Sequence, residues 1–323
     1  MCTAISFLSK NHYFGRNLDF EYSYNEKITI MPRNFPLSFR KTETIQRHYA
    51  IIGMATVDNG YPLYFDGTNE CGLSMAGLYF PENAVYLPAA DGKDNITPFE
   101  FIPWILSQCK DIKEAVHLLR KINLVNIPYS KEYPLSPLHW IIADRESSIT
   151  AEPTEKGLEI YDNPVGVLTN NPPFMFHMHN LANYMNITNE EPVNRFSHKA
   201  DIQAYSKGMG AIGLPGDSSS ASRFIRAAFT KLNSVCDSDE SSSVSQFFHI
   251  LGSVAQLKGC VKTADGYEKT IYSSCCNTDE GIYYYKTYDN WQITGVSLNS
   301  TELNCDKLSE FPLNIVQQFR IKN

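Results

Sequence analysis

The order of the expected secondary-structure elements limits the fold of this chain more than any other feature of its sequence. Strand patterns, with apolar residues that alternate or form short runs between turns, occur in three blocks separated by helical patterns. The expected strands span 3–8, 13–16, 26–32, 50–57, 61–66, 72–79, 139–143, 148–152, 158–161, 166–169, 269–274, 281–287 and 291–298. The expected helices span 98–108, 111–122, 174–184, 221–232 and 244–257, with an exposed charged turn at 237–243. This order suits two stacked sheets with helices outside and specifies, by itself, an α+β protein.

The size and charge of the chain exclude some classes of protein. A length of 323 residues fits one large domain or two smaller ones. The sequence contains no internal repeat and no clear linker, so we expect a single domain that spans residues 1–323. The hydrophobic content of 43% is enough for a sizeable core. The net charge of −7 argues against a nucleic-acid partner, which requires a basic face.

The chain carries no sequence signal for a membrane, a secretory pathway or a metal. No apolar run reaches the roughly 20 residues of a transmembrane helix, and the first residues lack the basic and apolar segments of a secretory signal. We therefore expect a cytoplasmic protein whose eight cysteines are reduced. The pair His177 and His179 lacks the spacing of helical zinc ligands. We expect no metal and no organic cofactor.

The first residues offer a nucleophile and a base on one amino acid. Cys2 directly follows Met1, and because cysteine is small we expect Met1 to be removed. Cys2 would then carry both a thiol and a free α-amine. The reference pKa of an α-amine is about 7.7–8.0, so much of it is neutral near neutral pH and can accept the proton of the thiol.

The residues after Cys2 predict a hairpin that returns to it. The strands expected at 3–8 and 13–16 are joined by a turn at 9–12, which brings Arg16 and Asp19 beside Cys2. Arg16 favours a thiolate, and Asp19 can orient the α-amine as the third member of a catalytic group does. On these residues alone the alternative is a buried structural cysteine with a surface Arg/Asp pair, because free cysteine commonly packs as a small hydrophobe.

Two stretches of this hairpin, Cys2 to Ile5 and Tyr13 to Asp19, resemble the choloylglycine hydrolase family. These proteins are N-terminal-nucleophile (Ntn) amidases and include bile salt hydrolases and penicillin V acylases. Five more segments resemble the family in the same order, so the resemblance covers essentially the whole chain. They are 95–104, 168–172, 213–217, 222–224 and 246–251. The resemblance implies the Ntn-hydrolase fold, a four-layer αββα sandwich of two antiparallel sheets, and a homotetramer.

The resemblance also assigns roles to residues that lie far from Cys2 in the sequence. Asn170 precedes Asn171 and two prolines, a context that is commonly a turn, but the resemblance implies that its amide holds the oxyanion. Arg223 lies near the start of an expected helix, where a cation is unfavourable to the helix dipole. The resemblance implies that it is the active-site arginine of the family.

Tyr79 is a departure from one branch of the family. Bile salt hydrolases carry asparagine at the matching place, and penicillin V acylases carry tyrosine. If the backbone N–H of residue 79 is the second oxyanion donor, its side chain can vary without loss of hydrolysis. Elsewhere the chain is more similar to bile salt hydrolases, in 95–104, 134–140 and 271–276. One changed pocket residue shifts discrimination by about 1–3 kcal/mol.

We therefore expect hydrolysis of glycine- or taurine-conjugated bile acids through a Cys2 thioester, with penicillin V as the alternative substrate. An apolar slot for the acyl group is expected at Leu18, Tyr24, Phe65 and the loop 130–137, although each is also explicable as core or loop.

Two other classes of function remain open on the sequence. A conventional cysteine hydrolase would pair Cys71 or Cys109 with a histidine, but neither has a recognised nucleophile signature. The candidate histidines are His139 and His249. A non-catalytic steroid-binding protein would keep the fold without the chemistry. The presence of all five candidate residues argues against it. They are Cys2, Arg16, Asp19, Asn170 and Arg223.

Overall fold

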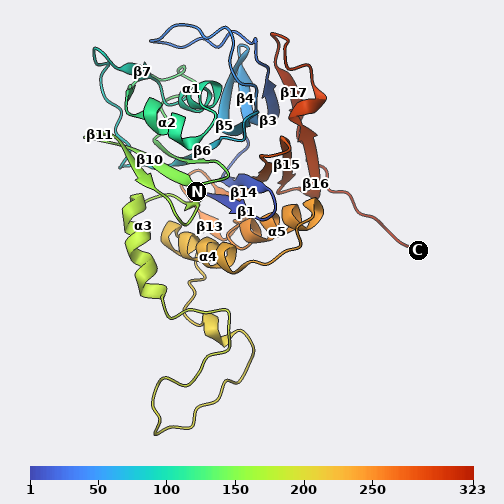
Figure 1. Cartoon of the computed structure of the whole chain (residues 1–323). Coiled ribbons are helices and arrows are strands. Elements are labelled where there is room, and N and C mark those ends of the chain that lie inside the picture. Colours follow the sequence, from blue (N-terminus) through green and yellow to red (C-terminus); the bar gives the residue numbers. More distant parts are fainter.

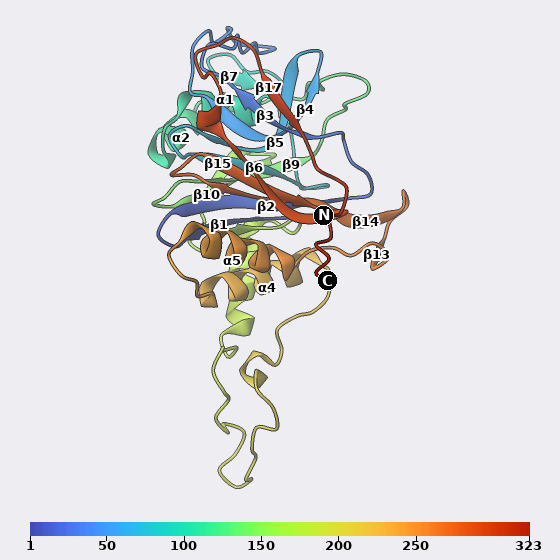
Figure 2. The same ribbon diagram turned by 90° about the vertical axis from the view of Figure 1, so that its right-hand side faces the viewer.

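The computed structural model describes residues 1–323 and has four layers. Two antiparallel sheets lie face to face at the centre, and helices cover the outer face of each sheet (Figures 1 and 2). The expected αββα sandwich is thereby confirmed. The helices are α1 (Phe101–Gln108), α2 (Ile112–Leu119), α3 (Phe174–Asn180), α4 (Ser220–Asn233) and α5 (Glu240–Gly252), with short 3₁₀ turns η1 (Leu181–Tyr184), η2 (Met209–Ala211) and η3 (Leu298–Ser300). None of these helices has the length and apolar character needed to cross a membrane.

The first sheet holds the N-terminal hairpin near its centre. Its strand order is β12-β1-β2-β14-β15-β16, and β13 pairs with β14. Within the hairpin, Cys2 pairs with Leu18 and Ala4 pairs with Arg16. Helices α4 and α5 cover one face of the hairpin and the second sheet covers the other, so nearly all of its residues are buried. The strands are β1 (Cys2–Leu8), β2 (His12–Phe20), β12 (Val167–Leu168), β13 (Val261–Lys262), β14 (Tyr267–Asn277), β15 (Ile282–Thr287) and β16 (Asn290–Ser297).

The second sheet has the order β11-β10-β9-β6-β5-β4-β3-β17 and is buried on both faces. Its apolar residues alternate between the two faces. In β4, Ile52 and Met54 belong to the core shared with the first sheet, whereas Ile51 and Ala55 belong to the core under α1 and α2. The strands are β3 (Lys27–Met31), β4 (Ile51–Asp58), β5 (Tyr61–Asn69), β6 (Ser74–Tyr79), β9 (Leu138–Ala143), β10 (Ser148–Thr154), β11 (Gly157–Asp162) and β17 (Ser309–Pro312).

The two sheets and their helices enclose two hydrophobic cores. The larger, with 37 buried residues, fills the space between the sheets and the space under α4 and α5, and it includes Cys2. The smaller, with 22 buried residues, lies between the second sheet and the helices α1 and α2. Cys2 is therefore held at the end of a strand within the larger core rather than on a free terminus.

Three local expectations were wrong. Helix α5 begins at Glu240, because the Asp239 side chain accepts a hydrogen bond from the Ser242 N–H at 2.9 Å and caps the helix, so the second half of the expected turn at 237–243 is helical. The helix ends at Gly252 rather than at 257. Beyond it, the N–H of Gln256 donates to Thr270 Oγ1 of β14 at 2.8 Å instead of to a helical carbonyl. Helix α2 ends at Leu119 rather than at 122, and Ile122 instead begins the strand β8 (Ile122–Leu124), which pairs with β7 (Asp94–Ile96).

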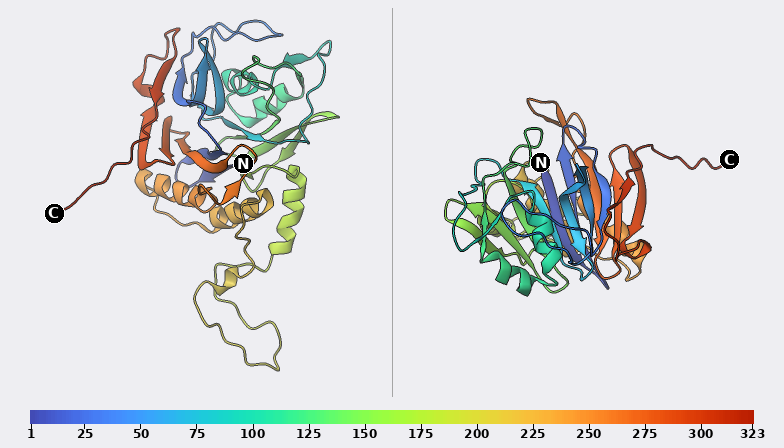
Figure 3. Two further views of the ribbon diagram at one scale, coloured as in Figure 1. Left: turned by 180° about the vertical axis from the view of Figure 1, so that it is seen from behind. Right: turned by 90° about the horizontal axis from the view of Figure 1, so that it is seen from above.

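A long arm, residues 185–216, projects from the body between α3 and α4 (Figures 1 and 3). Its base is closed by a backbone hydrogen bond of 3.0 Å from Thr188 N to Gly210 O. The C-terminal tail leaves the body at another place and ends away from it (Figure 3). The arm exposes six large apolar side chains, namely Met185, Val193, Phe196, Ile202, Tyr205 and Ile212.

Candidate functional site

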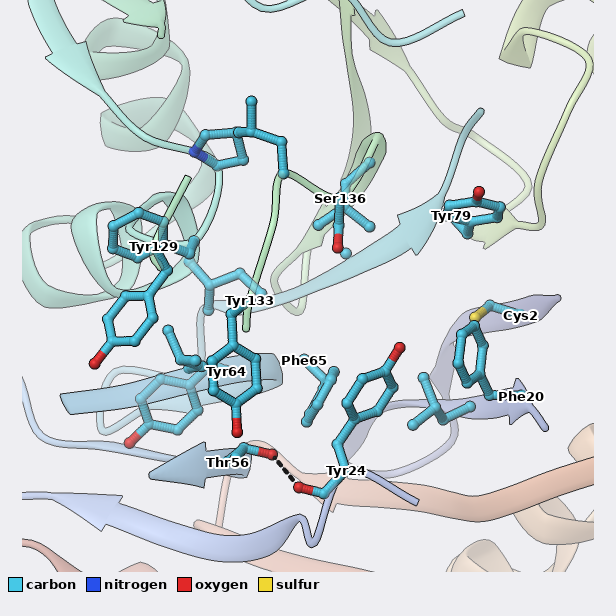
Figure 4. Close-up of a pocket in the computed structure, with 18 of the residues that line it drawn as sticks. Cys2, Phe20, Tyr24, Thr56, Tyr64, Phe65, Tyr79, Tyr129, Tyr133 and Ser136 are labelled. Atoms are coloured by element: carbon cyan, nitrogen blue, oxygen red, sulfur yellow. Dashed lines mark hydrogen bonds between the residues drawn. The ribbon is translucent and has the colours of Figure 1, made fainter. Parts of the chain in front are cut away.

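The thiol of Cys2 faces a cavity of about 290 Å³ near the ends of strands from both sheets. Cys2 is the first residue of β1 and is 4% exposed. Aromatic side chains surround the cavity and extend away from the sulfur (Figure 4). Sixteen of the 24 residues that line it are hydrophobic, so its wall suits an apolar ligand with one reactive end beside Cys2.

Arg16 carries a fixed positive charge beside this thiol. The hairpin register places Arg16 opposite Ala4, and its side chain is fully buried. Its Nη1 donates to the backbone oxygens of Gly77 and of Phe65, the latter at 3.3 Å. Burial lowers the pKa of the Arg16 guanidinium, but attraction from the Cys2 thiolate and nearby acidic groups outweighs burial and leaves that pKa above its usual value. Arg16 is therefore charged at any pH at which the protein is folded.

Asp19 lies next to the N-terminus of the chain. Its backbone oxygen accepts a hydrogen bond of 2.8 Å from the Met1 α-amine, which also pairs with Glu268 Oε1 at 2.7 Å. Oδ1 of Asp19 accepts from Thr270 Oγ1 at 2.6 Å, while its Oδ2 is buried without a partner. Burial raises the pKa of the Asp19 carboxyl, and attraction from Arg223 opposes part of that rise. Asp19 thus keeps one free oxygen near the start of β1.

Asn170 links the start of β1 to the rest of the site. Its Oδ1 accepts from Cys2 N at 2.8 Å and from Arg223 Nη2 at 2.7 Å, and its Nδ2 donates to Tyr79 O at 2.7 Å. A side-chain amide nitrogen carries two hydrogens, so one remains for another acceptor. Arg223 also donates to Cys2 O and to Thr3 Oγ1, the latter at 2.7 Å. These bonds fix the amide plane of Asn170 against Cys2.

The backbone of Tyr79 faces the same place. Phe80 N donates to Pro137 O at 2.7 Å, so the backbone groups of Phe80 point toward β9. Successive residues of an antiparallel strand point their N–H and C=O groups to opposite edges. Tyr79 therefore points both groups away from β9, and its C=O meets Asn170. Its N–H lies on that same edge, where a second oxyanion donor is expected.

All residues predicted from the sequence to form the site lie close together in the structure. Cys2, Arg16, Asp19 and Tyr79 line the cavity, and Asn170 and Arg223 contact Cys2 directly. The expected apolar slot lies at the same cavity, which is lined by Leu18, Tyr24, Phe65 and five residues of the loop 130–137. Their placement agrees with the sequence analysis, while their roles stay predictions.

Several aromatic residues of the cavity wall were not expected from the sequence. Phe20 and Tyr22 continue from the end of β2 and pack edge-on at 4.9 Å between ring centroids, and Phe20 lies 5.2 Å from the ring of Tyr24. Aromatic residues at every second position, 20, 22 and 24, were a signal in the sequence that could have found them. Tyr129 and Phe99 lie farther along the wall and had no such signal.

The alternative cysteine–histidine pairs find no support in the geometry. Burial raises the pKa of the Cys109 thiol to about 12, so it is protonated at physiological pH. Burial also raises the pKa of the Cys71 thiol. Both ring nitrogens of His139 are engaged, one by Glu152 at 2.9 Å and one by Thr169 O at 2.9 Å.

Comparison with known proteins gives a consistent result over the whole chain. The model of the family described as linear amide C–N hydrolases, choloylglycine hydrolase family, matches residues 2–311. A bile salt hydrolase/transferase from Lactiplantibacillus plantarum is 56% identical over 324 residues, which is 100% of both chains. The structure of the C2A mutant of conjugated bile acid hydrolase from Clostridium perfringens superposes with a TM-score of 0.92 at 37% identity, covering 100% of both chains.

A more distant solved structure shares the fold. Penicillin V acylase from Agrobacterium tumefaciens gives a TM-score of 0.76 at 18% identity, covering 97% of this chain and 92% of that one.

Proposed function

Because this chain belongs to the choloylglycine hydrolase family of linear amide C–N hydrolases, we propose that it cleaves the amide bond of glycine- or taurine-conjugated bile acids, with Cys2 as the nucleophile. The observation that carries the proposal is the position of the Cys2 thiol, which lies between a charged arginine, a fixed amide and an apolar cavity. The relative from L. plantarum is named a bile salt hydrolase/transferase, and its 56% identity to this chain supports the same class of substrate.

The proposal requires removal of Met1. With Met1 attached, Cys2 N is a peptide nitrogen, and it donates to Asn170 Oδ1 at 2.8 Å. Once Met1 is removed, the same nitrogen becomes an α-amine, beside its own thiol. The free Oδ2 of Asp19 and the carboxylate of Glu268 are nearby acceptors for its protons. The catalytic unit is then a single Ntn-hydrolase domain that covers the chain.

The reaction proceeds through a thioester in two halves. The Cys2 α-amine takes the proton of the thiol, and the thiolate attacks the carbonyl carbon of the scissile amide. The second hydrogen of Asn170 Nδ2 and the N–H of Tyr79 hold the oxyanion that forms. The C–N bond then breaks, and glycine or taurine leaves with the proton from the α-amine. Water, deprotonated by the same amine, attacks the thioester and releases the free bile acid and the thiol.

Arg16 and Arg223 have different tasks in this scheme. Arg16 lies beside the sulfur and stabilises the thiolate by its charge. Arg223 does not line the cavity, but it donates to Cys2 O and to Asn170 Oδ1, so it holds the nucleophile and the oxyanion amide in one arrangement. Arg16 thus stabilises the thiolate charge, and Arg223 fixes the geometry of Cys2 and Asn170.

The second candidate function is cleavage of penicillin V. The observation that favours it is Tyr79, whose side chain stands at the cavity rim and is 44% exposed. The mechanism is unchanged, since both substrates present an amide carbonyl to the thiol. The substrates differ in the acyl group, which is a bulky steroid acid in one case and phenoxyacetate in the other.

We also infer a homotetramer, in which the arm contacts neighbouring subunits. The support is its composition, because six large apolar side chains on a projecting segment are costly to leave in water. Sedimentation of the purified protein tests this assembly, and a monomer at micromolar concentration would contradict it. The cytoplasmic location stays a prediction from the sequence.

The experiment that tests the function is product analysis on glycocholate, taurocholate and penicillin V in parallel. We expect release of glycine or taurine to exceed release of phenoxyacetate. Cys2→Ala should abolish every activity, and an uncleavable extension before Cys2 should do the same. Mass spectrometry of active protein should find Cys2 as its first residue. Full activity with Met1 attached would refute the mechanism, and tight bile-acid binding without any product would favour the steroid-binding alternative.

A further inference from the structure

Two buried histidines hold the backbone of the segment that carries Asn170. His139 in β9 places Nε2 at 2.9 Å from the carbonyl oxygen of Thr169. His177 in α3 places Nε2 at 2.9 Å from the carbonyl oxygen of Asn170. Both side chains have no solvent exposure. Because a carbonyl oxygen only accepts hydrogen bonds, both Nε2 atoms must carry a hydrogen.

The other nitrogen of His139 meets a carboxylate. Nδ1 lies 2.9 Å from Oε1 of Glu152 in β10, and this same oxygen accepts the Phe174 N–H at 3.0 Å. His139 therefore has an acceptor on each side. The carbonyl takes one hydrogen from the ring, and a second hydrogen lies between Nδ1 and Oε1. The pair His139 and Glu152 thus holds two protons and no net charge.

His139 also touches the strand that carries the second oxyanion donor. Its ring stacks on Phe80, with centroids 4.2 Å apart and planes inclined by 4°. Phe80 directly follows Tyr79, as Asn170 directly follows Thr169. One imidazole ring therefore contacts the neighbour of each proposed oxyanion donor, although neither His139 nor Glu152 lines the cavity.

We propose that His139 and Glu152 are positioning residues, which fix the relative placement of the Asn170 amide and the Tyr79 N–H. This inference rests on the proposed function of that site. The pair acts through a proton arrangement, since only a ring with a hydrogen on each nitrogen can donate to Thr169 O and to Glu152 Oε1 together. His177 supports the next carbonyl as a neutral ring, because burial lowers its pKa to about 4. The titratable groups near the pair are His177 and Tyr161.

The substitution Glu152→Gln separates this role from simple packing. The Phe174 N–H requires an oxygen at the Oε1 position, so the introduced amide must turn its oxygen toward both Phe174 and Nδ1. A neutral His139 has one hydrogen for two acceptors and must lose a bond, either to the oxygen of this amide or to Thr169. Glutamine has nearly the shape of glutamate, so the packing around β10 is kept while one of these two bonds is lost.

We expect Glu152→Gln to lower kcat about 10- to 100-fold at pH 7.5 with KM within about twofold, the size of effect of a small misplacement. The matched control is Glu159→Gln, at the register partner of Glu152 on β11, and it should behave as wild type. Wild-type kcat in Glu152→Gln, or a loss that appears in KM rather than in kcat, would overturn the proposal.

A second pair of variants keeps the test decisive if Glu152→Gln does not fold. His139→Gln retains an amide hydrogen for Thr169 O, whereas His139→Leu does not. We expect a higher kcat for His139→Gln, and equal kcat values would overturn the proposal.

If the wild-type protein hydrolyses none of these amides, the proposed function is contradicted. The positioning role is then judged by amide hydrogen exchange of residues 168–171, which reports local opening. Faster exchange in Glu152→Gln than in Glu159→Gln supports it, and equal exchange overturns it.

Discussion

The two sides of the Cys2 thiol differ in how they are built. On one side, polar groups from β2, β6, the segment after β12 and α4 bond to one another with little freedom, and Arg223 alone contacts four residues through its guanidinium. On the other side, aromatic rings and a loop form the cavity wall, where the Tyr24 ring packs on Phe20 and on Phe65. The polar side sets where an amide carbonyl must lie. The aromatic side sets what may be attached to it.

This difference separates two kinds of mutational effect. A change on the polar side alters groups that meet the transition state and should lower kcat. A change on the aromatic side alters contacts that are equal in the ground state and the transition state, so it should act on KM and on the choice of substrate. The kinetics of variants on the two sides test that separation.

The largest effect is expected for Asn170→Ala. The substitution removes one oxyanion donor and also the acceptor for Cys2 N, so kcat should fall by at least about 10²–10³. The neighbouring Asn171→Ala is the matched control, because the Asn171 amide donates to Pro81 O at 2.6 Å and contacts neither Cys2 nor Tyr79. Steady-state kinetics of both variants check the prediction. Similar losses in the two variants would mean that the segment matters for stability alone.

The polar side also shows what local sequence can reveal. The hairpin of β1 and β2 was predictable because it forms between neighbours in the chain, and its register follows from the turn. The β4–β5 turn was equally readable, since Asn59 and Gly60 adopt the positive φ values of 48° and 79° that their dipeptide favours. Arg16 and Asp19 could be placed beside Cys2 on this local basis.

Asn170 and Arg223 could not be placed in this way. Arg223 lies 221 positions from Cys2 in the sequence, and their contact depends on how α4 packs beneath β1. Only the family resemblance nominated it. The same limit hid the contacts of His139, which the sequence offered only as a candidate partner of Cys71 or Cys109. Its bonds to Glu152 and Thr169 depend on how β9, β10 and the segment after β12 are brought together. Boundaries failed where a tertiary bond decided them, as at Gln256.

The next effect concerns stability in acid. Burial lowers the pKa values of His12 and His177 to about 4. The unfolded chain binds their protons near pH 6.5. Between about pH 6.5 and 4 the unfolded state therefore holds more protons than the folded state. As the pH is lowered through this range, the free energy of unfolding decreases by up to about 1.4 kcal/mol per pH unit and per histidine.

Buried carboxyls with raised pKa values, such as Asp19 and Asp66, act in the opposite direction, so the comparison of variants is the test. His177→Asn should show a shallower pH dependence of urea unfolding than wild type between pH 7 and 5. Because His177 bonds to the carbonyl oxygen of Asn170, the activity of the wild type should fall together with its free energy of unfolding as the pH is lowered. Parallel slopes in the two proteins would show that folding does not lower the pKa of His177.

At the rim, Tyr79→Asn should change the choice of substrate more than the rate. Asparagine is the residue that bile salt hydrolases of the family carry, and the proposed donor is the backbone N–H, which the substitution keeps. The ratio of kcat/KM for glycocholate to that for penicillin V should rise, by an amount equivalent to about 1–3 kcal/mol. Tyr79→Phe is the control that removes the hydroxyl alone. A fall in kcat for both substrates would show that the Tyr79 side chain acts in the transition state, as the polar groups around Cys2 do.

The smallest effect is expected for Tyr22→Ala at the outer edge of the cavity. The Tyr22 ring is 55% exposed and packs on Phe20 at 4.9 Å and Tyr24 at 5.3 Å between centroids. Loss of a half-exposed ring removes about 1 kcal/mol of apolar contact, so KM should rise by less than about tenfold. Because Tyr22 touches none of the polar groups around Cys2, kcat should stay at the wild-type value. A tenfold fall in kcat would show that the aromatic wall also orients the scissile bond, and the two sides of the thiol would then be one unit.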